Sequence, residues 1–158
     1  MGSLHPDISI RVTSSEKIKA GDKFFATGHI EVKGNHVVPE KDQEWLKTGD
    51  YGYINNEGEL YLTGRLGNNI IIQGYSHYQI ENLLATLTSV KQVAAIANKG
   101  IYDIYYEGDV DPAKIRKVLE VVPGSIINVI RRIEKMPVDN RHHSKILYQK
   151  LCIQNLKM

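Results

Sequence analysis

Short runs of alternating apolar and polar residues fill the first part of the chain, between residues 8 and 66. Many of the apolar positions are aromatic or β-branched, which is typical of β-strands. The turn-forming stretch Asn55-Asn56-Glu57-Gly58 separates YGYI from ELYLTG, so these two runs are predicted to form a hairpin. Regular strands joined by short turns favour a small barrel or a curled sheet.

Helical periodicity begins only after residue 67. In QIENLLATL, four apolar residues have the spacing of one helix face: Ile80, Leu83, Leu84 and Leu87. A second helix is predicted in DPAKIRKVLEVV, where Asp111 can serve as N-cap and Pro112 occupies the first helical position. A short third helix is expected in HSKILYQKLCI.

Strand-like runs separate these helices. Three of them, VKQVAAIAN, IYDIYYEG and SIINVIRRI, predict strands, and NIIIQGYSHY predicts a strand or a hairpin. The sequence therefore predicts an α+β fold class in two parts. A small distorted β-barrel-like unit is expected over residues 4–66, and a small α/β unit with a roughly three-stranded sheet over residues 67–158.

The amino-acid composition and net charge indicate the general class of protein and the kinds of partner to expect. The chain has 158 residues, of which 42% are apolar and 24% charged, as in folded globular proteins. Its 20 basic and 18 acidic residues give a net charge of only +2, which by itself gives no argument for a nucleic-acid or membrane-surface partner, and no nucleic-acid partner is expected. No apolar run approaches the roughly 20 residues of a membrane span. The single cysteine, Cys152, fits a reducing compartment, and a cytoplasmic location is expected.

The candidate chemistry lies in WLKTGDYGYINNEGELYLTGRLGNNII, residues 45–71. Two similar tripeptides, Thr48-Gly49-Asp50 and Thr63-Gly64-Arg65, stand at opposite ends of the predicted hairpin. Composition alone interprets Asp50 as a solvated turn residue at the start of a strand. It interprets Arg65 as one half of an ion pair, with Asp50 as a candidate partner.

This stretch begins a series of four motifs that follow one another along the chain. They are WLKTGDYGYINNEGELYLTGR, NNIIIQG, QIENLLATL and MPVDNRHHSKILYQKL. Across residues 45–151 their order and spacing resemble the C-terminal third of the AMP-forming acyl and aminoacyl ligases. That superfamily includes acyl-CoA synthetases, fatty acyl-AMP ligases, peptide-synthetase adenylation domains and luciferases. Residues 8–44 are similar to the strands of the family's last barrel subdomain, and residues 67–158 to its mobile lid.

The resemblance implies a reaction in two steps. The family's carboxylate substrate attacks the α-phosphate of ATP, giving an acyl-adenylate and pyrophosphate, and the acyl group then passes to a thiol. Asp50 matches the family's ribose-binding carboxylate, which accepts hydrogen bonds from both hydroxyls. Arg65 matches an arginine that reaches the nucleotide, and Lys145 the lysine that stabilises charge during adenylation. The alternative for Lys145 is a solvent-exposed lysine on the C-terminal helix.

Two glycines match positions with a structural role in the family, one at the pivot of the lid and one in the loop beside the acceptor thiol. Gly67 stands at the pivot of lid rotation, where the family usually has Asp or Lys, and glycine tolerates large backbone changes. The alternative is a plain linker glycine. Gly74 matches the glycine of the loop that lines the thiol-acceptor tunnel, although the chain departs from the family by being shorter after this loop. Ser144 also replaces the family's usual glycine before the lysine.

No metal site is predicted. His77, His142 and His143 do not form a zinc pattern with Cys152, because adjacent histidines point in different directions and the ligand spacing is not recognisable. The tyrosine-rich run YDIYY is expected to form sheet surface and core rather than a platform for stacking bases.

The family's phosphate loop, its magnesium-binding glutamate and its acyl pocket have no match in these residues. ATP or AMP with Mg²⁺ is therefore expected to serve the full-length ligase, with none held tightly by this chain, which is expected to be inactive alone. The expected partners are the rest of the ligase, a carboxylic acid and a thiol, with CoA preferred. Self-association through exposed apolar surface is a further expectation.

Two alternatives stay open. The first is a fatty acyl-AMP ligase or amino-acid adenylation domain that loads a carrier protein. The second is a non-catalytic binding module that retains the lid fold.

Overall fold

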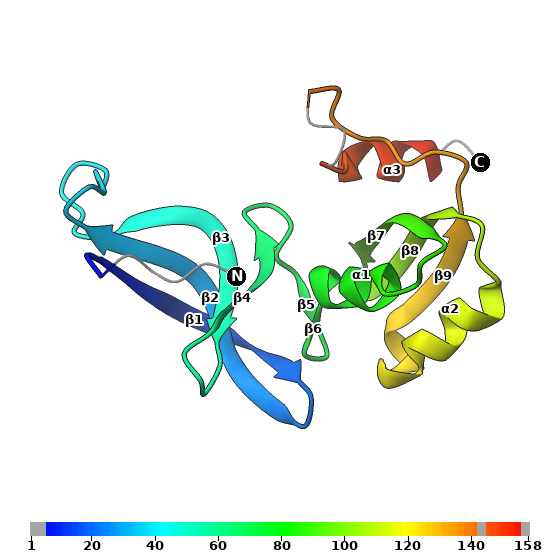
Figure 1. Ribbon diagram of the computed structural model, residues 1–158, viewed down its shortest axis with the longest axis horizontal. Helices are drawn as coiled ribbons and strands as arrows, with labels where there is room; N and C mark the ends of the chain where they lie inside the picture. Colours follow the sequence, from blue (N-terminus) through cyan, green and yellow to red (C-terminus); the bar gives the residue numbers. More distant parts are fainter. Residues whose placement is uncertain (1–5, 142–144, 156–158) are drawn as a thin grey trace. The chain divides into compact units, whose positions relative to one another are not determined.

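The computed structural model describes residues 6–141 and 145–155, which form two compact units divided between Ser76 and His77 (Figure 1). By their contacts, residues 67–76 belong to the first unit. The boundary between residues 66 and 67, predicted from the sequence, stays a prediction.

The first unit is built on an antiparallel sheet with the strand order β1-β2-β3-β4. Its strands are β1 (Ile8–Ala20), β2 (Lys23–Gly34), β3 (Leu46–Ile54) and β4 (Leu60–Arg65). Among the described residues β1 and β4 do not pair, so the curved sheet seen in Figure 1 stays open. Ile18, Ile30 and Tyr53 are buried in this unit. The predicted β-rich first part is confirmed.

A short hairpin follows, made of β5 (Ile71–Ile72) and β6 (Tyr75–Ser76). Its two turn residues, Gln73 and Gly74, have φ values of 48° and 84°, as a type I′ turn requires. The carbonyl of Gly74 accepts a hydrogen bond of 2.7 Å from the backbone N–H of Lys19. A Cβ on Gly74 would lie 3.2 Å from Cε1 of Phe24, so the hairpin tip packs closely on β1 and β2. The acceptor-loop role of Gly74 stays a prediction.

The second unit contains a three-stranded sheet with the order β7-β8-β9. The strands are β7 (Val90–Asn98), β8 (Ile101–Gly108) and β9 (Ile127–Arg132). The β7–β8 pair is antiparallel and the β8–β9 pair is parallel. A parallel pair needs a crossover, and α2 (Pro112–Val118) supplies it with the short 3₁₀ turns Leu119–Val121 and Gly124–Ile126. As predicted, Asp111 caps α2 by accepting a 2.8 Å hydrogen bond from Ala113 N–H.

Both faces of this sheet are covered. Figure 1 shows α1 (His77–Ala85) and α2 in front of the sheet, and α1 packs chiefly on β7. The adjacent residues Ala94 and Ala95 are both buried, and neighbours on a strand point to opposite faces. Ala94 belongs to a core cluster with Tyr105, Met136 and Leu151, the last of which lies in α3 (Tyr148–Asn155). The predicted α+β class is therefore confirmed.

In the part of the chain that the structure describes, no helix combines the length and apolar character needed to cross a membrane.

Candidate active site

The Thr48-Gly49-Asp50 tripeptide forms a bulge in β3. Strands β2 and β3 pair at His29↔Tyr51 and next at Glu31↔Lys47. Three residues of β3 therefore stand opposite the single residue Ile30. Gly49 has a φ of +80°, which other residues rarely adopt, and this allows the chain to turn out of the ladder. Bulges of this kind re-aim side chains and are frequent beside active sites.

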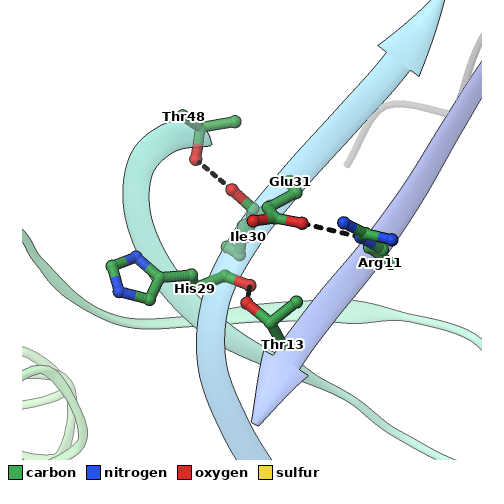
Figure 2. A network of polar contacts seen from close by, with 6 residues as sticks. All are labelled: Arg11, Thr13, His29, Ile30, Glu31 and Thr48. Carbon is green, nitrogen blue, oxygen red and sulfur yellow. Dashed lines mark hydrogen bonds and ion pairs between the residues drawn. The ribbon is translucent and has the colours of Figure 1, made fainter. Parts of the chain in front are cut away.

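Thr48 holds this bulge in place with one hydroxyl group. The hydroxyl donates to the carbonyl of Ile30 at 3.0 Å and accepts from the N–H of Asp50 at 3.1 Å. Figure 2 shows the first of these bonds within a network that joins β1, β2 and the start of β3. The backbone of Asp50 is thus positioned by a local contact rather than by ladder pairing.

The second tripeptide, Thr63-Gly64-Arg65, is also irregular. Pairing runs Tyr51↔Gly64 and then Gly52↔Leu62, which leaves Thr63 as an extra residue in β4. Thr63 is buried, and its hydroxyl lies 3.0 Å from that of Thr27. Both tripeptides therefore interrupt the regular pairing of their strands.

Asp50 and Arg65 face each other across the two strands. Arg65 Nε donates to Asp50 Oδ1 at 2.8 Å, and the side chains of Arg65 and Asp50 remain 57% and 31% exposed. The ion pair that composition alone suggested is therefore present. Exposed pairs of this kind contribute at most about 1 kcal/mol, so a ligand can replace the contact at little cost.

Gly67 lies in a tight hydrogen-bonded turn. The N–H of Asn68 donates to the carbonyl of Arg65 at 2.7 Å, and the N–H of Leu66 donates to the carbonyl of Gly49 at 2.8 Å. The φ of Gly67 is +86°, as the third residue of a type II turn requires. A Cβ at this position would meet no atom within 4 Å. The predicted pivot is thus a turn tied to the first bulge, and its hinge role stays a prediction.

Lys145 is exposed on the second unit, in an extended segment before α3. Its carbonyl accepts a 2.8 Å hydrogen bond from the N–H of Asp139, and its neighbour Ile146 forms a β-bridge with Val138. The predicted C-terminal helix is present, but it begins at Tyr148. Backbone pairing with residues 137–139 keeps residues 145–147 extended, so the lysine precedes the helix instead of lying on it.

Glu81 is a buried titratable residue that the sequence reasoning missed. It is buried on α1 and accepts hydrogen bonds from the N–H of Ala95 (2.9 Å) and the hydroxyl of Tyr148 (2.9 and 3.1 Å). Burial raises the pKa of Glu81 to about 7, although both hydrogen bonds act in the opposite direction. Burial and the nearby carboxylate also raise the pKa of Tyr148 well above its ordinary value.

The spacing of the buried residues of α1 is the sequence feature that could have identified Glu81. The buried positions of α1 are His77, Ile80, Glu81 and Leu84, whereas the predicted face was purely apolar. Their spacing is i, i+3, i+4 and i+7, so a template that admitted polar residues would have found them. Leu83 is only half-buried, which corrects the predicted face.

No metal cluster of three or more His, Cys, Asp or Glu side chains occurs within residues 6–141 and 145–155. Burial lowers the pKa of His77 to about 4, and its ring packs edge-on against Tyr148. His142 and His143 lie outside the described residues. As expected, the YDIYY run contributes to the core, with Tyr102, Tyr105 and Tyr106 buried.

Comparisons with known proteins identify the ligases to which the chain is related. No family model matches the chain. The 2-succinylbenzoate–CoA ligase of Listeria monocytogenes is 30% identical over 137 residues, which cover 73% of this chain and 29% of the ligase. The nonribosomal peptide synthetase atrA of Aspergillus terreus is 39% identical over 98 residues, covering 53% of this chain and 11% of the synthetase. The chain is homologous to the C-terminal part of the AMP-forming acyl and aminoacyl ligases.

Solved ligases share the fold. The O-succinylbenzoate coenzyme A synthetase MenE of Bacillus subtilis, in complex with AMP, aligns with a TM-score of 0.70 and 22% identity. The alignment covers 95% of this chain and 34% of MenE. The chain spans less than a third of the length of the curated ligases it matches.

Proposed function

We propose that this chain is the C-terminal part of an ATP-dependent ligase that activates a carboxylic acid as its acyl-adenylate and transfers the acyl group to CoA. The observation that carries the proposal is the bulged Asp50–Arg65 pair in a chain homologous to these ligases. Adenylate-forming chemistry needs a carboxylate for ribose hydroxyls and a cation for phosphate, and this pair offers both.

The exposed pair can exchange its internal contact for ligand contacts. An ionised carboxylate is a strong acceptor, so Asp50 would receive hydrogen bonds from the two ribose hydroxyls. Arg65 would then turn its planar guanidinium to the phosphate side of the nucleotide. The Thr48 hydroxyl keeps the backbone of Asp50 in place during this exchange.

Lys145 would supply the second cation. Its ammonium group would approach the α-phosphate and the substrate carboxylate, where negative charge develops during adenylation. We further propose that Gly67 is the pivot which allows residues 67–158 to move between the two half-reactions, and that Gly74 lines the path of the acceptor thiol.

The rest of the ligase would complete the site. Several large apolar side chains of the first unit are exposed, among them Phe24, Leu62 and Leu66, and we assign this surface to contact with the rest of the ligase. ATP would bind with Mg²⁺. The described residues supply no cluster of three carboxylate, imidazole or thiol ligands, and we assign the Mg²⁺ ligands to the rest of the ligase.

The test uses the natural reading frame and the ligase that it encodes. We expect coding sequence for several hundred residues upstream of Leu4. The purified ligase should catalyse ATP–pyrophosphate exchange with a panel of carboxylic acids but not with amino acids. Asp50→Asn should raise the KM for ATP. A frame closed upstream together with absent exchange would overturn the proposal and favour a non-catalytic module.

The acceptor has one alternative, a carrier protein, favoured by the 39% identity to a peptide synthetase. Incubating the adenylate-loaded ligase with CoA and, separately, with a phosphopantetheinylated carrier protein decides between them. Thioester formation with CoA alone supports the proposal, and thioester formation with the carrier alone contradicts it.

A further inference from the structure

The segment that carries Lys145 is held at two points of the second unit. On one side, residues 145–147 pair with residues 137–139 through the Asp139–Lys145 and Leu147–Pro137 backbone hydrogen bonds, each 2.8 Å. On the other side, Tyr148 begins α3, three residues after the lysine. The side chain of Lys145 is exposed between these two attachments.

The attachment at Tyr148 depends on one carboxylate. The Tyr148 hydroxyl donates to both oxygens of Glu81, at 2.9 and 3.1 Å, and Glu81 Oε1 also accepts from the N–H of Ala95 at 2.9 Å. Ala95 belongs to β7, which lies at an edge of the sheet, where a backbone donor needs a partner outside the ladder. Glu81 therefore joins α1, β7 and α3 at a single buried side chain.

Packing alone does not require this arrangement. The Tyr148 ring packs against a core cluster that contains Ala94, Tyr105 and Leu151, and a phenylalanine ring would fill the same space. The hydroxyl adds direction, because it can reach Glu81 only when the first turn of α3 is in register with α1. A polar group of a buried contact that is left without its partner carries a desolvation penalty, so this hydrogen bond favours one register of α3.

We propose that the Tyr148–Glu81 pair is a positioning device that fixes the start of α3 and thereby sets where the Lys145 ammonium group can reach. This inference rests on the proposed function, because the role of Lys145 in adenylation is part of that proposal. Tyr148 and Glu81 touch neither substrate nor nucleotide in this scheme, so both are positioning residues.

A first experiment tests the geometry in the 158-residue chain by NMR. The Ala95 amide proton should titrate with a midpoint near the Glu81 pKa of about 7. The midpoint should rise in Tyr148→Phe, because the lost hydroxyl stabilises the carboxylate, and the titration should vanish in Glu81→Gln. An unchanged midpoint in Tyr148→Phe would overturn the proposed contact.

Amide hydrogen exchange supplies the second readout. Tyr148→Phe should accelerate exchange at Leu147 and Leu151 about tenfold while the β8 amides keep their protection. Tyr61→Phe is the matched control, because it removes a hydroxyl–carboxylate bond of 2.9 Å to Glu59 from an exposed surface. Equal exchange in Tyr148→Phe and Tyr61→Phe would contradict the positioning role.

The functional test separates this inference from the proposed function. In the ligase, Tyr148→Phe should slow adenylate formation about tenfold and leave thioester formation from preformed adenylate within about twofold of wild type. Tyr61→Phe should change neither rate. Equal loss in both half-reactions would indicate a merely structural tyrosine and overturn the inference.

Lys145→Ala is the reference variant. If Lys145→Ala slows adenylate formation and Tyr148→Phe does not, the positioning role fails while the proposed function survives. If Lys145→Ala has no effect on adenylate formation, the proposed function fails for this residue, and any slowing in Tyr148→Phe contradicts action through Lys145.

Discussion

Two carboxylates in this chain are held in opposite ways. Asp50 pairs with a cation, Arg65, on the surface of the first unit, and both side chains remain substantially exposed. Glu81 is buried in the second unit and is held by a neutral hydroxyl and a backbone N–H. Water can replace either partner of the first pair, whereas the Ala95 N–H of the second pair is buried and the Tyr148 side chain is half-buried.

The difference separates a contact suited to ligand exchange from one suited to fixing geometry. A surface ion pair costs little to open, so a nucleotide can take the place of either partner. A buried carboxylate with polar donors is costly to disturb, because each donor left without an acceptor carries its full desolvation penalty. The proposed functions follow this division, with binding at Asp50 and positioning at Glu81.

The largest expected effect comes from removing each carboxylate in turn. Glu81→Ala should lower the free energy of unfolding by about 4 kcal/mol, because a buried N–H, a half-buried hydroxyl and a buried side chain lose their contacts. Asp50→Ala should cost less than about 1 kcal/mol. Urea unfolding followed by circular dichroism measures both, and similar losses in the two variants would remove the basis of the comparison.

The next effect is a pH dependence from Glu81. Its pKa in the fold is about 7, above the ordinary 4.5, so the folded state keeps a proton that the unfolded state releases between these values. Its contribution to stability is complete below pH 4.5 and is lost as the pH rises to 7, by about 3 kcal/mol.

Comparing wild type with Glu81→Gln isolates this contribution. His77 acts in the opposite sense, since its lowered pKa of about 4 gives a contribution present above 6.5 and lost as the pH falls through 4. The His77 effect occurs in both proteins and cancels in the difference. A wild-type-minus-variant stability that is flat between pH 5 and 8 would refute the buried-carboxylate interpretation.

The smallest effect is the coupling between Asp50 and Arg65. A double-mutant cycle with Asp50→Asn and Arg65→Gln should give a coupling energy below about 1 kcal/mol that falls further in high salt. The same cycle with Glu81→Gln and Tyr148→Phe should give a larger and salt-insensitive value. A strong, salt-insensitive Asp50–Arg65 coupling would mean that the pair is structural and not readily opened by a ligand.

Local signals explain what the sequence predicted correctly. The Asn55–Gly58 turn, the Asp111 cap and the apolar run of β7 each depend on neighbouring residues, and each has the expected structure. The Asp50 and Arg65 positions were also predicted to mark the ends of the hairpin, and these residues are cross-strand partners.

Nonlocal contacts explain what the sequence did not predict. Strand β1 continues through the polar run TSSEKIKA, because pairing with β2 satisfies its backbone whatever the side chains are. The bulges at Thr48–Asp50 and Thr63 depend on the register of a partner strand, which periodicity within one strand does not reveal. The hydrogen-bond partner of Glu81 is also nonlocal, because Tyr148 lies 67 residues later in the chain.

The central claim is that Lys145 belongs to the adenylation machinery. Measuring the two half-reactions of the ligase separately tests this claim most directly. In the ligase that contains this chain, Lys145→Ala should slow adenylate formation about 10²- to 10³-fold, the usual loss for one charge-stabilising group. Thioester formation from preformed adenylate should stay near the wild-type rate. Lys150→Ala, which removes an exposed lysine from α3, is the control and should leave both rates unchanged. Equal loss of both half-reactions in Lys145→Ala, or no loss in either, would contradict the account.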